Sequence, residues 1–300
     1  MAVRRRVAAL LAASLLSSPV AAAAPLPSMQ APGATIPAVT LIGAGDIASC
    51  SSSGDEQTAE VLDRFAGTVF TTGDNVYPSG TLSQFRNCYG PSWGRHKART
   101  RPAAGNHEYR TTGAEGYFGY FGSAAGNPNR GWYAYNRGAW RIYALNSNCA
   151  QVHGCWVGSP QERWLRADLA AHPRACAMAY WHHPLFSSGK HGNQPQVRGL
   201  WKALNAADAE IVVNGHDHSY ERFAPQDWQA TADPQGIREF VVGTGGRSHY
   251  TRVSVQPNSE AWDETSFGVL KLVLGDGWYR WRFVAAGSST FRDSGTADCH

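Results

Sequence analysis

The sequence lacks the features that mark several common classes of protein. No apolar run reaches the roughly 20 residues that a membrane-spanning helix needs, because residues 7–16 are followed by Ser17-Ser18-Pro19. No run of lysine and arginine lies outside Arg4-Arg5-Arg6, and neither a Cys-x-x-Cys pair nor a repeat of solenoid length occurs. These absences argue against a nucleic-acid-binding surface, a cysteine metal site and a repeat architecture.

The first 24 residues have the organisation of a secretory signal peptide. Arg4-Arg5-Arg6 precede the apolar segment, which leads to small residues at 20–24. Removing this leader takes away three of the 27 basic residues and none of the 23 acidic ones, so the mature chain is nearly neutral. We expect a leader at 1–24, a proline-rich lead-in at 25–37 and one catalytic domain at 38–300. The protein is then secreted, to the cell exterior or the cell envelope, with no membrane span left.

The remaining composition fits one exported domain. About 275 mature residues are enough for a single large core of α/β type, and 43% of the chain is hydrophobic, with eleven tryptophans. Six cysteines in an exported chain predict disulfide bonds. The six allow 15 complete pairings, and only Cys149 with Cys155 is suggested by closeness in sequence.

Short apolar runs and helical periodicity predict an α/β fold. Residues 39–42 and 68–72 are β-branched runs, and the segment 55–66 between them places Ala59, Leu62 and Phe65 on one helical face. This is a β-α-β unit. Further strands are expected at 132–135, 140–145, 175–181, 211–213, 239–242, 269–274 and 279–284, and helices are expected from 159 onward and at 197–204.

Five short segments contain side chains that bind metals. They are Gly45-Asp46, Gly73-Asp74-Asn75-Val76-Tyr77, Gly105-Asn106-His107-Glu108, Trp181-His182-His183-Pro184 and Gly215-His216-Asp217-His218. Several directly follow a predicted strand, and ligands of open α/β sheets gather at the carboxyl ends of the strands. Any one segment could occur by chance, and Asp46 or Asp74 taken alone would more often be a turn-forming carboxylate than a metal ligand. Together they predict a two-metal hydrolase site, in which cations about 3.5–4 Å apart generate a nucleophile and neutralise developing charge.

In this order the segments resemble those of the calcineurin-like metallophosphoesterases, and within them the purple acid phosphatase type. The resemblance covers residues 38 to 275 and extends through Ser219-Tyr220-Glu221-Arg222. It implies a four-layer αββα sandwich with two mixed β-sheets, and a metal-dependent phosphoric ester hydrolase similar to acid phosphatases. Many relatives carry a histidine ligand where this chain has Ala48, and Tyr77 is the expected replacement.

The resemblance also implies which side chains hold the metals. The ligands of the first metal are Asp46, Asp74, Tyr77 and His218, and those of the second are Asp74, Asn106, His182 and His216. The bridging residue is Asp74. A phenolate oxygen suits a hard trivalent ion and imidazole suits a divalent one, so the expected pair is Fe(III) with Zn, Fe or Mn. His182 is preferred to the adjacent His183 because it is the first residue after the strand.

The reaction implied by the resemblance is hydrolysis of a small phosphate monoester by a metal-bound hydroxide. His107, helped by His191, would contact the phosphate and protonate the departing alkoxide, a role that suits imidazolium near neutral pH. Two alternatives stay open. One is a phosphodiesterase or nucleotidase that uses the same site, and the other is a secreted binding protein whose metal site is structural or inactive.

Overall fold

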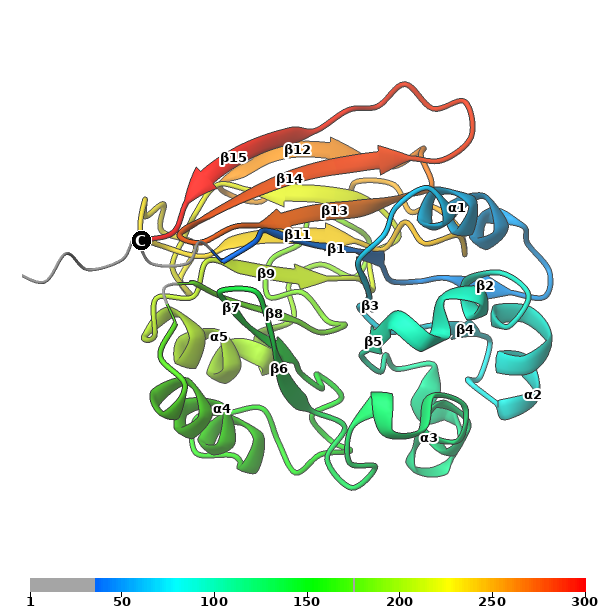
Figure 1. The fold of residues 1–300 in the computed structure, drawn as a ribbon, viewed down its shortest axis with the longest axis horizontal. Helices are drawn as coiled ribbons and strands as arrows, with labels where there is room; N and C mark the ends of the chain where they lie inside the picture. The colour runs from blue at the N-terminus through cyan, green and yellow to red at the C-terminus, as the bar shows by residue number, and fades with distance from the viewer. Residues whose placement is uncertain (1–35, 175) are drawn as a thin grey trace, which may run out of the picture. The chain divides into compact units, whose positions relative to one another are not determined.

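The computed structural model describes residues 36–174 and 176–300, whose strands form two large sheets that face each other (Figure 1). The expected leader at 1–24, and the expected lead-in as far as residue 35, lie outside the described residues. Across the two described stretches, no helix has both the length and the apolar character that crossing a bilayer requires.

The two sheets contain six and seven strands. The first sheet has the order β15-β14-β13-β1-β3-β5, with the bounds β1 (Val39–Ala44), β3 (Thr68–Thr71), β5 (Thr100–Pro102), β13 (Gly268–Leu274), β14 (Trp278–Ala285) and β15 (Ser294–Asp298). The second sheet has the order β12-β10-β11-β9-β8-β7-β6, with the bounds β6 (Tyr133–Arg137), β7 (Trp140–Ala144), β8 (Cys176–Tyr180), β9 (Ile211–Asn214), β10 (Tyr220–Phe223), β11 (Arg238–Val242) and β12 (Ser259–Asp263).

The remaining elements are short. A small parallel pair joins β2 (Ala48–Ser49) to β4 (Val76–Tyr77). The α-helices are α1 (Gly54–Asp63), α2 (Leu82–Gln84), α3 (Glu115–Phe121), α4 (Pro160–Ala171) and α5 (Arg198–Asn205). Irregular helical turns, of 3₁₀ or π type, are formed by Phe85–Tyr89, Trp93–Arg99, Glu108–Arg110, Thr112–Ala114, Gly122–Ala125 and Pro195–Val197.

Each sheet combines a parallel group of strands with antiparallel neighbours. In the first sheet β1, β3 and β5 are parallel, while β13, β14 and β15 are antiparallel. In the second sheet β7, β8, β9 and β11 are parallel, and β6, β10 and β12 are antiparallel. The predicted α/β fold with two mixed sheets is confirmed, and the carboxyl ends of the parallel strands are the edges at which ligands are expected.

The parallel strands of the second sheet bury both of their faces. On β8, Met178 and Tyr180 belong to the core between the sheets, whereas Ala177 and Ala179 pack with Leu165 of α4 and other residues of α4 and α5. Successive side chains of a strand point to opposite faces, so a strand covered on both sides reads as one continuous apolar run. On the other side of the sandwich, α1 contacts β13 and β14.

The structure extends and corrects the expectations for single elements. The strands β5, β10, β12 and β15 were not predicted, because they are short or rich in polar residues. The residues Ser159-Pro160-Gln161-Glu162 at the start of α4 predict a capping box. The Ser159 hydroxyl does accept from the Glu162 N–H, but the Glu162 carboxylate accepts from Gly158 N at 2.8 Å, so the reciprocal bond of the box is not formed.

All six cysteines form disulfide bonds. The predicted bond between Cys149 and Cys155 is confirmed. The other two bonds join Cys50 to Cys88 and Cys176 to Cys299. Neither could be derived from the sequence, because their partners are distant along the chain and meet only in the folded sandwich.

Phe70→Ala should test the contact between the sheets. The ring of Phe70 on β3 is fully buried and lies 5.5 Å from the ring of Tyr180 on β8. We expect its removal to lower the free energy of unfolding by about 3–5 kcal/mol, because it leaves a cavity between two rigid sheets. Val253→Ala, at an exposed position, should change it by less than about 0.5 kcal/mol. Urea titration of the disulfide-bonded proteins measures the free energy of unfolding of both variants. A decrease for Phe70→Ala as small as that for Val253→Ala would contradict a stabilising contact between the sheets at Phe70.

Candidate metal centre

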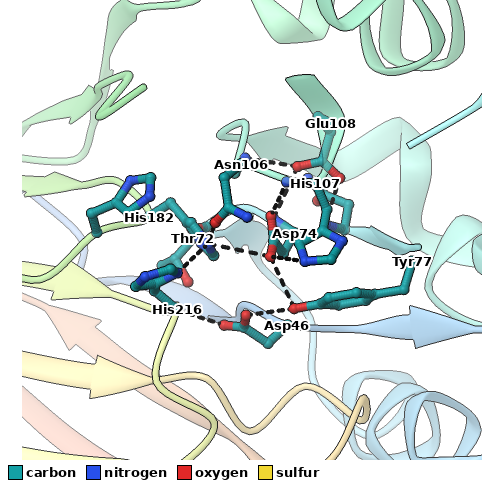
Figure 2. A network of polar contacts seen from close by, with 12 residues as sticks. Asp46, Thr72, Asp74, Tyr77, Asn106, His107, Glu108, His182 and His216 are labelled. Atoms are coloured by element: carbon teal, nitrogen blue, oxygen red, sulfur yellow. Dashed lines mark hydrogen bonds and ion pairs between the residues drawn. The ribbon is translucent and has the colours of Figure 1, made fainter. Parts of the chain in front are cut away.

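The candidate ligands lie in loops that follow five parallel strands, three from one sheet and two from the other. One candidate ligand follows each of these strands: Asp46 after β1, Asp74 after β3, Asn106 after β5, His182 after β8 and His216 after β9. Figure 2 shows that their side chains converge on one region. His218 joins them from the loop that carries His216, and Tyr77 joins them from the short strand β4, which follows the loop of Asp74.

Glycines allow these loops to approach one another closely. A Cβ atom at Gly105 would lie 2.1 Å from Asp74 Oδ1, and one at Gly215 would lie 2.5 Å from Asp46 Oδ2, so any side chain at either position would collide. Asp46, Asp74 and His216 have positive φ values of 58°, 48° and 72°. Such backbone strain in residues other than glycine is typical of functional sites.

The four side chains expected around the first metal lie together. The Tyr77 hydroxyl is 2.7 Å from Asp46 Oδ1, 3.0 Å from Asp74 Oδ2 and 3.2 Å from His218 Nε2. His218 Nε2 is also 3.3 Å from Asp46 Oδ1. All four side chains are buried, so their polar atoms depend on one another or on a bound ion for partners.

The side chains expected around the second metal also meet. His182 Nε2 lies 3.0 Å from Asn106 Oδ1, 3.2 Å from His216 Nδ1 and 3.4 Å from Asp74 Oδ2. Asp74 Oδ2 therefore contacts members of both groups, as a bridging ligand must.

The chemistry of these donor atoms fits cations. His182 Nδ1 lies 3.0 Å from the carbonyl oxygen of Thr72, and donation to that carbonyl leaves Nε2 with its lone pair facing the centre. That lone pair then faces the oxygens of Asn106 and Asp74, and such an arrangement is repulsive unless a proton or a metal ion lies between them. The set of carboxylates, imidazoles, phenol and amide suits metals of the zinc and iron type.

In the absence of a metal ion, protons separate these facing donor atoms. Burial lowers the pKa of His182, but the neighbouring Asp74, Asp46 and Glu108 carboxylates together raise it, to about 9. Burial, together with the Asp46 and Asp74 carboxylates, holds the pKa of Tyr77 well above its usual value, so the phenol keeps its proton. Metal binding through these groups must release those protons, and the affinity must therefore rise with pH.

Glu108 fixes the relative position of the two loops that carry Asp74 and Asn106. Its Oε2 accepts from Asp74 N at 2.9 Å and from Gly105 N at 2.7 Å, and its Oε1 accepts from Asn75 N at 2.8 Å and Val76 N at 3.3 Å. One buried carboxylate thus satisfies four backbone donors that would otherwise be unpaired.

Sequence reasoning missed one supporting residue. The Ser248 hydroxyl lies 2.7 Å from His218 Nδ1, which directs Nε2 of the same ring toward Tyr77. Ser248 lies in an irregular segment about which the sequence gives no signal. Asp217, in contrast, lies within the segment Gly215-His216-Asp217-His218 that the sequence indicated. Its carboxylate accepts hydrogen bonds from the His191 backbone N–H at 2.8 Å and from the Ser187 hydroxyl at 2.6 Å.

His107 lies at the solvent-facing side of the group. Its side chain is 17% exposed, compared with 0–4% for Asp74, His182, Asp46 and His218. Its ring centroid is 4.3 Å from that of Tyr77, and Nδ1 is 2.6 Å from the carbonyl oxygen of Pro78. Burial lowers its pKa more than the Asp74 carboxylate raises it, so the net shift is downward.

The other two candidate histidines are also close to the centre. His191 stacks on His216, with ring centroids 4.2 Å apart. His183 Nδ1 bonds to the Ser147 hydroxyl at 2.7 Å, and a nitrogen of this ring lies within 4.8 Å of nitrogens of His182 and His216. The preference for His182 as the ligand stays a prediction, favoured by its contacts with Asn106 and Asp74.

The sequence profile described as "Calcineurin-like phosphoesterase" matches residues 40–220, which include all the candidate ligands. The chain belongs to this family. This membership supports the predicted enzyme class, the metal-dependent phosphoric ester hydrolases. The calcineurin-like family implies a binuclear metal site, in accord with the two groups of donor atoms described above.

Relatives with curated sequences match parts of the calcineurin-like domain. An uncharacterized protein of Mycobacterium tuberculosis is 29% identical over 198 residues, which cover 59% of this chain and 34% of that protein. Purple acid phosphatase 21 of Arabidopsis thaliana is 33% identical over 111 residues, which cover 32% of this chain and 25% of that protein. The chain thus spans about a third of these relatives' length or less, and the plant match supports the expected purple acid phosphatase type.

Solved structures confirm the predicted sandwich. The purple acid phosphatase PPD1 from yellow lupin seeds aligns with a TM-score of 0.68 at 20% identity, over 88% of this chain and 54% of that chain. GAP50 of Plasmodium aligns with a TM-score of 0.69 at 13% identity, over 88% and 89% of the two chains. At these identities the likeness concerns the fold.

The roles of the paired histidines can be separated by substitution. His182→Ala should reduce the bound metal to about one ion per chain, because Nε2 is the donor that faces Asn106 and Asp74. His183→Ala is the matched control and should retain both ions, since its Nδ1 is engaged by Ser147. Metal analysis of the two purified variants measures this directly. Metal loss confined to His183→Ala would reverse the assignment.

Proposed function

We propose that this chain is a secreted phosphatase that hydrolyses phosphate monoesters at a two-metal centre. The supporting observation is that one carboxylate, Asp74, contacts both groups of donor atoms at the meeting point of two sheets. Bound metals would supply a nucleophile from water and neutralise charge at phosphorus. The first metal would be held by Asp46, Asp74, Tyr77 and His218, and the second by Asp74, Asn106, His182 and His216.

The charge of the donor set favours a trivalent ion with a divalent one. Two carboxylates and one phenolate carry three negative charges, and the imidazoles and the amide are neutral. Five positive charges on Fe(III) with Zn, Fe or Mn leave the centre positive, which favours an anionic ester. The phenol of Tyr77 is the hardest donor and suits Fe(III).

His107 is proposed to supply the proton for the leaving group. Alkoxides leave poorly, and an imidazolium at the solvent-facing side can protonate the departing oxygen. Its lowered pKa places the charged form on the acid side of neutrality, in keeping with an acid phosphatase. His191, stacked on His216, is proposed to assist at the phosphate.

The disulfides support the proposed secretion. All six cysteines are paired in the structure, and such bonds form and persist in oxidising compartments. We therefore retain the proposal that residues 1–24 are a leader and that the domain functions outside the cytoplasm.

The decisive experiment combines metal analysis, spectroscopy and kinetics on the mature protein. We expect two metal ions per chain, hydrolysis of p-nitrophenyl phosphate faster than of its bis ester, and a violet colour from a Tyr77–Fe(III) bond. Asn106→Ala is the negative control and should lose turnover by orders of magnitude together with one ion. Active protein with a single ion per chain would overturn the proposal, and faster cleavage of the bis ester would favour a phosphodiesterase.

His107→Ala should separate proton donation from metal binding. We expect both metals to remain, because His107 is not among the proposed ligands. The rate should fall by about 10²–10⁴-fold for alkyl phosphates, whose leaving groups need a proton, and by much less for p-nitrophenyl phosphate. In the unchanged protein, alkyl phosphate hydrolysis should decline as the pH rises above the lowered pKa of His107. Equal losses for both kinds of ester would exclude the acid role.

A further inference from the structure

Three cationic side chains next to the candidate metal centre have no acidic partner. They are Arg110, Lys190 and Arg247, here called the rim cations. Arg110 ends the helical turn Glu108–Arg110, and the other two lie in separate loops. Among the residues that the structure describes, none of the three forms an ion pair. Other arginines, such as Arg141, Arg222 and Arg238, do pair with carboxylates.

Arg110 lies against the proposed proton donor. One of its terminal nitrogens, Nη1, donates to the carbonyl oxygen of Pro78 at 3.1 Å, and Nη2 lies 3.3 Å from His107 Nε2. Apart from these contacts, Arg110 is exposed to solvent. The guanidinium thus lies directly beside the imidazole of His107.

Arg247 and Lys190 rest on the aromatic rings of the site. The Arg247 guanidinium lies 5.1 Å from the ring centroid of Tyr77, and its backbone N–H donates to the Asp46 carbonyl at 3.0 Å. Lys190 Nζ lies 4.7 Å from the ring centroid of Tyr250, which in turn stacks on His218 at 4.0 Å. Contact with a ring face orients a cation without neutralising it.

Arg110 therefore touches the proposed acid, Arg247 lies over the ring of a proposed ligand, and Lys190 is one side chain away from the ligand His218. Two bound metals would already neutralise the phosphate that reacts, so three further unpaired charges at its border exceed what a simple monoester requires. Arginine and lysine are the side chains that recognise phosphate, arginine through two parallel hydrogen bonds.

We propose that the rim cations form a subsite for a second phosphate group of the substrate, so that organic bisphosphates and polyphosphates are preferred over simple monoesters. This rests on the proposed function and names its substrate class. Arg110 contacts His107, Arg247 lies over the ring of Tyr77, and Lys190 lies over Tyr250 beside His218. All three therefore border the proposed centre, where a second phosphate carried on a short linker would meet them.

A matched substrate pair tests the subsite. Propane-1,3-diol bisphosphate and propyl phosphate share an alkyl leaving group and differ in the second phosphate. We expect kcat/KM to be about tenfold higher for the bisphosphate, and Arg247→Gln or Lys190→Gln to reduce that ratio about threefold to fivefold, mainly through KM. Arg198→Gln, at an exposed arginine of α5, is the control and should leave the ratio unchanged.

Binding measured without turnover gives a second readout. The metal-loaded protein should bind propane-1,3-diphosphonate more tightly than propylphosphonate by calorimetry, and the Arg247→Gln/Lys190→Gln double variant should lose this preference while keeping both metals. If both esters are hydrolysed but the variants leave the ratio of kcat/KM for the bisphosphate to that for propyl phosphate unchanged, only the subsite is overturned. Failure to hydrolyse either ester, with the rim-dependent binding preference intact, would overturn the proposed function instead.

Discussion

The site and the loops that form it depend on how two buried carboxylates obtain hydrogen-bond partners. Asp46 and Asp74 face each other across the Tyr77 hydroxyl, with 0% and 2% of their surface exposed. Isolated ionised groups cannot stay in such a place, because removal from water costs several kcal/mol per ion. Each aspartate therefore also accepts a backbone N–H, Asp46 from His216 and Asp74 from His107, both at 2.8 Å. The same bonds that satisfy the carboxylates draw the histidine loops into place.

Two sheets are what make this arrangement rigid. The carboxylates and the amide of the site follow β1, β3 and β5 of the first sheet, and its imidazoles follow β8 and β9 of the second. Because the strands are hydrogen-bonded to their neighbours and packed on both faces, the loops begin at fixed points, and sites on such scaffolds are more precise than sites on loops alone. The glycines that directly precede Asp46, Asp74, Asn106 and His216 then permit an approach that no larger residue would allow.

The sequence predicted the parts of the site that follow from repetition. A β-branched run followed by Gly-Asp, as at Asp46 and Asp74, signals a strand end that carries a ligand, and the five segments together indicated a metal site. Ser248 could not be found in this way, because its contact with His218 arises only from tertiary packing. Polar edge strands such as β12 and β15 were missed for a related reason, since their pairing depends on neighbours rather than on local apolar pattern.

The bond between Cys176 and Cys299 ties together the two layers of the sandwich. Cys176 begins β8, inside the second sheet, and Cys299 directly follows β15, the outermost strand of the first. An outermost strand exposes unpaired backbone groups that can recruit another chain. Anchored at its last residues to an interior strand 123 positions away, β15 cannot swing outward to do so. The covalent tie therefore guards this protein against self-association as well as against unfolding.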